Sequence, residues 1–149
     1  MFLRALLAFI ALPGMVAIAL PASWVWISPG TGLAHRAGLV LLAVGLLALL
    51  WCVRIFYVSG KGTLAPWSPP KKLVITGPYR YTRNPMYVAV ATMLAGWAVS
   101  FASWGLFIYA VAVSIAFHLR VVYGEEPWLG QTHGAEWHQY SSRVPRWFW

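Results

Sequence analysis

Four apolar stretches set the pattern of the chain, and polar segments separate them. Residues 5–27 carry no charge, and residues 37–53 carry none either, with apolar character continuing past Arg54 to residue 58. A helix that spans a bilayer needs about 20 apolar residues, because the hydrocarbon core is about 30 Å thick and each residue adds about 1.5 Å. Both stretches reach that length and are predicted to be transmembrane helices.

The other two apolar stretches, residues 86–101 and 104–117, are slightly short. They become long enough if flanking aromatic residues lie at the membrane interface, where Trp and Tyr are enriched. The tight segment between them then joins two antiparallel helices. The sequence therefore predicts an all-α, polytopic membrane protein in one domain, residues 1–149, with four spans near residues 5–27, 37–58, 86–102 and 104–123.

The first stretch follows a short basic start that ends at Arg4, as a secretory signal peptide does. Its apolar character runs on to Ile27, which is too long for the apolar core of a typical signal peptide. We therefore expect a retained helix. Pro13 and Pro21 are expected to kink it, which membrane helices tolerate when neighbouring groups satisfy the freed carbonyls.

The composition supports a membrane location. The chain is 60% hydrophobic and 9% charged, whereas a soluble domain carries about 25% charged residues. A chain this apolar could not cover its own surface in water, so the lipid bilayer is its expected solvent and partner. The single cysteine, Cys52, cannot form an internal disulfide and is interpreted as a packing residue.

The net charge of +8 has a topological explanation. With the amino terminus inside, four spans leave Arg36 alone on the outer side. The positive-inside rule then predicts that both termini and the middle loop lie in the cytoplasm. We expect an integral protein of the bacterial inner membrane. No nucleic-acid-binding motif accompanies the charge, so nucleic acid is not an expected partner. The other basic residues are Arg4, Arg54, Lys61, Lys71, Lys72, Arg80, Arg83, Arg120, Arg143 and Arg146.

Two polar segments, residues 60–87 and 118–149, lie on the side predicted to be cytoplasmic. The second is expected to form a short interfacial helix and loop, with its tryptophans in an interfacial belt. Because the last two spans form a hairpin, the two segments are expected to be neighbours in space.

The facing ends of these segments carry opposite charges. The basic cluster is expected to face two adjacent carboxylates: Arg80, Arg83 and Asn84 against Glu125 and Glu126. The carboxylates could instead form a solvated helix end, or pair with Arg80 or Arg83 only to fix the fold. A carboxylate near a low-dielectric boundary also suits a cationic ligand.

Several motifs occur in order in these segments, and the membrane hairpin separates the first from the rest. They are Lys72-Leu-Val-Ile-Thr-Gly-Pro-Tyr-Arg-Tyr-Thr-Arg-Asn-Pro-Met-Tyr87, Glu125-Glu-Pro-Trp-Leu129, Trp137-x-x-Tyr140 and Arg143-Val-Pro-Arg146. Together they resemble the integral membrane methyltransferases, which include isoprenylcysteine carboxyl methyltransferases and phospholipid N-methyltransferases. Gly60-Lys-Gly62 also resembles a glycine motif near the cofactor of this family.

The resemblance implies S-adenosylmethionine as the methyl donor, enclosed by helix ends and the carboxy-terminal segment. It implies that Leu73 and Val74 line the adenine. Glu125 would meet the polar end of the cofactor, with Glu126 as a second acidic partner. The other residues implied are Tyr79, Arg83, Asn84, Pro85 and Tyr87 in the pocket wall, and Tyr140 and Arg143 in a lid.

The sequence departs from the family pattern at two positions. Asn84 stands where isoprenylcysteine-type enzymes usually have histidine, and Ala89 stands where a glycine often occurs. The first departure retains the cofactor pocket implied by the resemblance but weakens an assignment to prenylated proteins.

The candidate residues suit the chemistry of this cofactor. Carboxylates can hold its ammonium through charge-assisted hydrogen bonds, and the ring faces of Tyr79 and Tyr87 could stabilise its sulfonium. An amine acceptor must lose a proton, which His118 or Glu126 could accept, while Arg120 could hold an anionic head group. His118 lies seven residues before the first glutamate, so an uninterrupted helix would put both on one side. In the alternative interpretations, His118 is a packing residue and Arg120 is a charge that only sets the topology. No metal site is predicted.

The sequence therefore predicts an integral membrane methyltransferase that uses S-adenosylmethionine. Its acceptor would be lipophilic or membrane-embedded, such as an isoprenylcysteine-like carboxylate or a lipid amine. The alternative is a non-enzymatic membrane protein with this fold, such as a transporter subunit, an assembly factor or a lipid-binding scaffold. Binding of S-adenosylhomocysteine distinguishes the enzyme from the alternative.

Overall fold

The computed structural model describes residues 10–28, 32–60 and 72–148, and every regular element in these ranges is helical. The all-α prediction is therefore confirmed. The start of the first predicted span, Arg4, Lys61, Gly62 and Lys71 lie outside the described residues. In chain order the elements are η1 (Ile10–Ala19), α2 (Leu20–Ile27), α3 (Arg36–Gly60), η2 (Gly77–Arg80), α4 (Pro85–Phe101), α5 (Trp104–Arg120), η3 (Val121–Glu125) and α6 (Glu126–Arg143).

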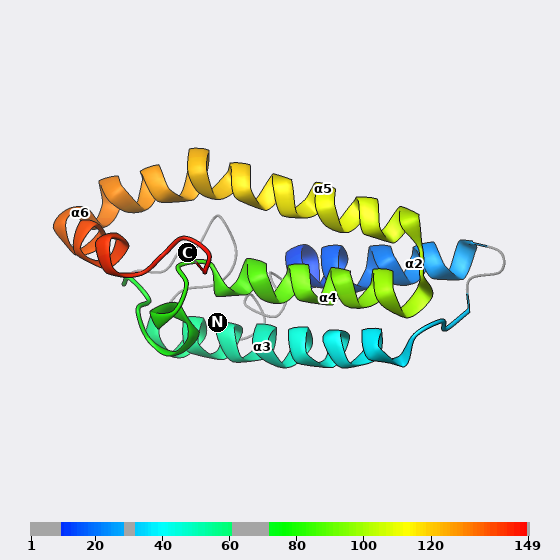
Figure 1. Ribbon diagram of the computed structural model, residues 1–149. Helices are drawn as coiled ribbons and strands as arrows, with labels where there is room; N and C mark the ends of the chain where they lie inside the picture. Colours follow the sequence, from blue (N-terminus) through cyan, green and yellow to red (C-terminus); the bar gives the residue numbers. More distant parts are fainter. Residues whose placement is uncertain (1–9, 29–31, 61–71, 149) are drawn as a thin grey trace.

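Helix α4 occupies the centre of the bundle (Figure 1). It packs against α3 along its length, and it also contacts α5 and η1. The α3–α4 interface is close because glycine faces it: a methyl group on Gly38 would lie 2.3 Å from the backbone nitrogen of Ser100. Small residues permit this approach of helix backbones in membrane proteins. Helix α5 lies on the opposite side of α4 from α3.

Two helical stretches in the described ranges are long and apolar enough to cross a bilayer, Arg36–Phe56 and Trp104–Arg143. Pro13–Ile27 and Pro85–Phe101 are apolar but shorter. The sequence predicted four full-length spans, but only two helices in these ranges are long enough to cross a bilayer. The helix that begins at α5 also continues well beyond residue 123, where its span was predicted to end.

A two-residue connection joins α4 to α5, in agreement with the predicted hairpin. Ala102 closes α4 in a left-handed conformation, with φ of 46° and ψ of 39°. Ser103 then caps α5, because its hydroxyl accepts a hydrogen bond from the backbone nitrogen of Leu106 at 3.4 Å. The hairpin brings the start of α4 and the end of α5 to the same end of the bundle (Figure 1).

Pro21 lies in the first turn of α2, and side chains from α4 and α5 bind the carbonyls that precede it. Proline has no N–H, so it removes the helical donor of the carbonyl four residues earlier in an α-helix, or five residues earlier in a π-helix. Trp97 Nε1 donates to the carbonyl of Ala17 at 2.9 Å, and the Tyr109 hydroxyl donates to the carbonyl of Val16 at 3.0 Å. Neighbouring helices therefore bind these carbonyls, which is the condition under which membrane helices tolerate proline.

Trp97→Phe is expected to lower the free energy of unfolding by about 1–3 kcal/mol, because a buried carbonyl would lose its donor. Ala17, which carries that carbonyl, is 0% exposed. Thermal unfolding in detergent micelles measures the effect. Trp26→Phe is the matched control, since Trp26 is 91% exposed. Equal melting temperatures for the two variants would contradict the prediction.

A π-helical turn, η3, joins α5 to α6, so the predicted interfacial helix is an extension of the last span. Within α6 the helical path bends at Gly134, which has φ of 50° and ψ of −119°. The bend turns the end of α6 back toward the bundle, and the carboxy-terminal segment then runs past the start of α4 (Figure 1). This return brings the two polar segments together.

Candidate functional site

The polar residues of interest gather at the end of the bundle where α4 begins. Before it, η2 starts at Gly77, whose φ of 61° suits glycine and where a Cβ would press on Ile55 at 3.3 Å. Asn84 precedes α4, and Pro85 occupies its first turn, where a missing N–H removes no helical hydrogen bond. The loop thus presents residues 82–84 to α6 and the carboxy-terminal segment.

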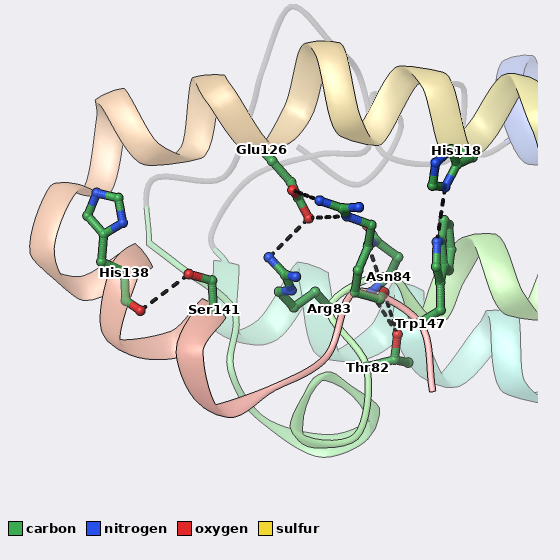
Figure 2. A network of polar contacts seen from close by, with 9 residues as sticks. Thr82, Arg83, Asn84, His118, Glu126, His138, Ser141 and Trp147 are labelled. Atoms are coloured by element: carbon green, nitrogen blue, oxygen red, sulfur yellow. Dashed lines mark hydrogen bonds and ion pairs between the residues drawn. The ribbon is translucent and has the colours of Figure 1, made fainter. Parts of the chain in front are cut away.

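Glu126 lies at the centre of a buried ion-pair network (Figure 2). Arg83 Nη1 lies 3.0 Å from its Oε1. Arg146 donates from Nε to Oε1 at 2.9 Å and from Nη2 to Oε2 at 2.7 Å, which makes a bidentate pair. The side chains of Arg83 and Glu126 are 13% and 15% exposed. Both carboxylate oxygens are occupied, which argues against the predicted roles of Glu126 as a proton acceptor or cofactor ligand.

Burial and charge act in different directions on the two arginines. Burial lowers the pKa of Arg83, although the carboxylate of Glu126 opposes this effect. For Arg146, the hydrogen bonds to Glu126 raise the pKa. The Arg83 guanidinium also lies 5.5 Å from the centre of the Trp137 ring. Trp137 is therefore a buried contact of the network, not a member of the predicted interfacial belt.

The carboxy-terminal segment crosses the residues that precede α4. Thr82 Oγ1 and Asn84 Nδ2 donate to the carbonyl of Arg146 at 2.9 and 3.0 Å. The backbone nitrogen of Arg83 donates to the carbonyl of Pro145 at 3.0 Å. The side-chain amide of Asn84, a predicted cofactor ligand, thus holds this segment in place (Figure 2).

Glu125 has partners different from those of its neighbour. Its Oε1 accepts hydrogen bonds from the Tyr87 hydroxyl and from Arg120 Nε, the latter at 2.9 Å. Arg120 Nε also lies 3.2 Å from the Tyr87 hydroxyl. The other oxygen of Glu125 has no donor in the described part of the chain, and the side chain is 34% exposed. One side of this carboxylate is therefore open to a ligand.

The π-helical turn explains why His118 does not join Glu125. The seven-residue spacing assumed an uninterrupted α-helix, but η3 winds 5 residues in a wider turn. His118 Nδ1 instead accepts a hydrogen bond from Trp147 Nε1 at 3.2 Å (Figure 2). The neutral ring then carries its proton on Nε2, so the packing interpretation of His118 is favoured over a general base.

Tyr79 is buried beside this cluster and its hydroxyl is unused. The residue is 6% exposed, and the hydroxyl has no hydrogen-bond partner among the residues that the structure describes. Burial raises the pKa of Tyr79 well above its usual value, and the neighbouring Cys52 and Tyr140 add to the effect. Buried polar groups without partners are rare in proteins, so this hydroxyl marks a place for a polar ligand group.

The remaining predicted residues fall into two groups. Leu73 is half-buried and Val74 is buried in the extended segment before η2, where the predicted adenine contacts would lie. Arg80 was expected to face the glutamates but forms no ion pair with either of them in the described part of the chain. It lines a separate open hollow of about 480 Å³ together with Arg143. Tyr140, predicted for the lid, donates its hydroxyl to the carbonyl of Tyr79 at 2.7 Å.

Sequence reasoning missed three residues of the network: Thr82, Arg146 and Trp147. The Arg143-Val-Pro-Arg146 motif marked the segment, but its spacing does not reveal that Arg146 pairs with Glu126. The sequence carries no signal that separates Thr82 or Trp147 from ordinary interfacial residues.

One comparison with known proteins bears on this site. Residues 33–136 match the family model described as phospholipid methyltransferase. The match extends from just before α3 into α6, so it includes α4, α5 and both glutamates. No curated protein and no solved structure matches the chain.

Proposed function

The chain belongs to the phospholipid methyltransferase family, and from this premise we propose that it moves a methyl group from S-adenosylmethionine to a lipophilic acceptor in the membrane. The observation that carries the proposal is the Glu125 carboxylate, which is held at one oxygen and open at the other. Tyr87 and Arg120 fix its position, and the unpartnered hydroxyl of Tyr79 is buried nearby.

The residues present fit this cofactor. The open oxygen of Glu125 can accept a charge-assisted hydrogen bond from the ammonium group, and the Tyr79 hydroxyl can bond to a further polar atom. The ring of Tyr87, whose centre lies 4.5 Å from that of Phe117, offers an aromatic surface that favours a cation. When bound, the cofactor supplies a methyl group activated by a sulfonium. The task of the protein is then positioning and exclusion of water.

Arg120 is the residue best placed to hold the acceptor. Its Nε is fixed by Glu125 and Tyr87, while its terminal nitrogens have no acceptor in the described ranges. Its side chain is 53% exposed, and a guanidinium matches the geometry of a carboxylate or a phosphate. His118 and Glu126 are engaged elsewhere. The proposal therefore covers a carboxylate, which needs no base, and a lipid amine whose proton leaves to water.

We propose the membrane placement that the sequence predicted, with four spans and the Glu125 end of the bundle in the cytoplasm. The lengths of Arg36–Phe56 and Trp104–Arg143 support it directly. The shorter apolar helices lie parallel to these two in the same bundle (Figure 1). The charge distribution supports the orientation, because Arg36 lies at the end opposite to the other described basic residues.

Two measurements on the full chain in detergent test the function. The protein should bind S-adenosylhomocysteine saturably. With a labelled methyl donor and isolated membranes, it should give a labelled lipophilic product, whose identification then names the acceptor. A folded protein that binds no S-adenosylhomocysteine would overturn the proposal in favour of the non-enzymatic alternative.

Tyr79→Phe is expected to separate cofactor binding from stability. The substitution removes a buried hydroxyl without a partner, so the melting temperature of the cofactor-free protein should stay unchanged or rise. S-adenosylhomocysteine should bind about 2- to 10-fold more weakly, since a neutral hydrogen bond is worth about 0.5–1.5 kcal/mol. Tyr81→Phe is the control, because Tyr81 is 73% exposed. Unchanged affinity in Tyr79→Phe would show that the cofactor does not contact this hydroxyl.

A further inference from the structure

An open hollow lies apart from the Glu125 cluster, between the segment before α4 and the second half of α6. Its volume is about 480 Å³. The hydrogen bond from the Tyr140 hydroxyl to the Tyr79 carbonyl joins one of its walls to the cofactor region, and neither Glu125 nor Glu126 lines it. The residues that line it are Ile75, Arg80, Glu136, Gln139, Tyr140, Arg143 and Val144.

The hollow concentrates positive charge that the protein does not neutralise. Arg83, Arg120 and Arg146 all pair with glutamates, but neither Arg80 nor Arg143 forms an ion pair with a described residue. The single acidic residue of the lining is Glu136, so two cations face one anion. A guanidinium presents several donors in a fork that matches phosphate oxygens. The two arginine side chains that line the hollow therefore suit a phosphate group.

The hollow lies at the level where α3 leaves the apolar region. Gly77, which begins η2, packs beside Ile55, and the ring of Tyr79 lies 6.4 Å from that of Phe56. The apolar part of α3 that is long enough to span a bilayer ends at Phe56. The end of η2 at Arg80 therefore lies near the head groups of the adjacent leaflet. Cytoplasmic leaflets are rich in anionic lipids, whose surface potential attracts cationic side chains.

We propose that this hollow binds the phosphate group of an anionic membrane lipid, held by Arg80 and Arg143. The site is separate from the methyl-transfer centre and rests only on the membrane placement proposed above. Such a lipid would contact both the η2 segment and the end of α6. It would thereby stabilise the arrangement that carries Tyr79 and the carboxy-terminal segment.

Titration of the purified full chain with short-chain phosphatidylglycerol, followed by thermal shift, tests the site. The wild type should show a saturable rise in melting temperature. Arg80→Gln and Arg143→Gln should each weaken the apparent affinity by at least about tenfold, as loss of a charged hydrogen-bond partner does. Glu136→Gln should bind more tightly, because it removes the anion on the rim. Arg36→Gln, which removes the same charge from the opposite end of α3, is the matched control and should bind like the wild type.

Other ligands identify the source of the phosphate. Phosphatidylcholine or phosphatidylethanolamine that binds as tightly as phosphatidylglycerol would overturn the preference for an anionic lipid. Inorganic phosphate that binds as tightly would overturn a lipid source. Wild-type affinity in both arginine variants would overturn the site itself. If Arg80→Gln fails to fold, Arg80→Lys keeps the charge without the fork and should bind with intermediate affinity. Retained S-adenosylhomocysteine binding in these variants would show that the hollow is independent of the cofactor site.

Discussion

Glu125→Gln is expected to weaken the binding of S-adenosylhomocysteine by about 10- to 100-fold, and to lower methyl transfer at subsaturating cofactor by a similar factor. A hydrogen bond to a charged group is worth about 1.5–3 kcal/mol, which sets this range. The amide cannot balance the charge of the cofactor ammonium, and it also weakens the contact that fixes Arg120 at 2.9 Å. Calorimetric titration measures the affinity, and a labelled-donor assay measures the transfer.

The fold should survive this substitution. The side chains of Arg120 and Glu125 are 53% and 34% exposed, and exposed ion pairs contribute about 0–1 kcal/mol to stability. Glu125→Asp keeps the charge on a shorter side chain and should retain part of the affinity. Wild-type affinity in Glu125→Gln would contradict the proposed place of the cofactor. Loss of affinity together with a large fall in melting temperature would assign Glu125 a structural role instead.

The helices could be predicted from the sequence because a bilayer imposes a length on apolar stretches. Arg36–Phe56 agrees with the second predicted span, residues 37–58, to within about two residues at each end. The same rule over-counted the full-length spans, since α4 has 17 residues. Its ends are set locally, by Pro85 at one end and by the left-handed Ala102 at the other.

The partners of the charged residues could not be predicted, because sequence spacing assumes a single helical period. The wider turn of η3 changes the direction of the residues that follow it. Glu125 and Glu126 are adjacent, so they do not share a face of the helix, and they pair with different arginines. Arg80 was expected beside them because it lies close to Arg83 in sequence, but η2 ends at Arg80 and leaves it at the separate hollow. The sequence suggested an ion pair of these glutamates with Arg80 or Arg83, and of the observed ion pairs only that of Arg83 with Glu126 matches this alternative.

Acidic residues are scarce in this chain, so the different partners of the two adjacent glutamates matter for its function. The chain has 3 acidic and 11 basic residues, and two of the acids are adjacent at this end of the bundle. One acid is saturated by two arginines and holds the carboxy-terminal segment against α6. The other holds a single arginine and keeps an oxygen open. The site therefore leaves one carboxylate of the adjacent pair for a cationic ligand.

Glu126→Gln is expected to lower the free energy of unfolding by about 2–4 kcal/mol. Loss of one partner from a buried ion pair costs about 3–5 kcal/mol, because the remaining charge stays buried without compensation. Arg83 is 13% exposed and would be left in that state, whereas Arg146 is 35% exposed, so water screens part of its charge. Unfolding in mixed detergent micelles measures the change. Faster cleavage by trypsin after Arg146 would report release of the carboxy-terminal segment.

A double-mutant cycle with Arg146→Gln isolates the pair. The double variant should lose less stability than the sum of the two single variants, because the second substitution removes one of the two cations left without a partner. Glu125→Gln is the matched control, since it makes the same change one residue earlier and should alter stability by less than about 1 kcal/mol. Equal losses of stability at both positions would contradict the separate roles inferred from the contacts. Loss of stability at Glu126 and loss of cofactor binding alone at Glu125 would follow from the different partners of the two carboxylates, because Glu126 is saturated by two arginines and Glu125 keeps one oxygen open.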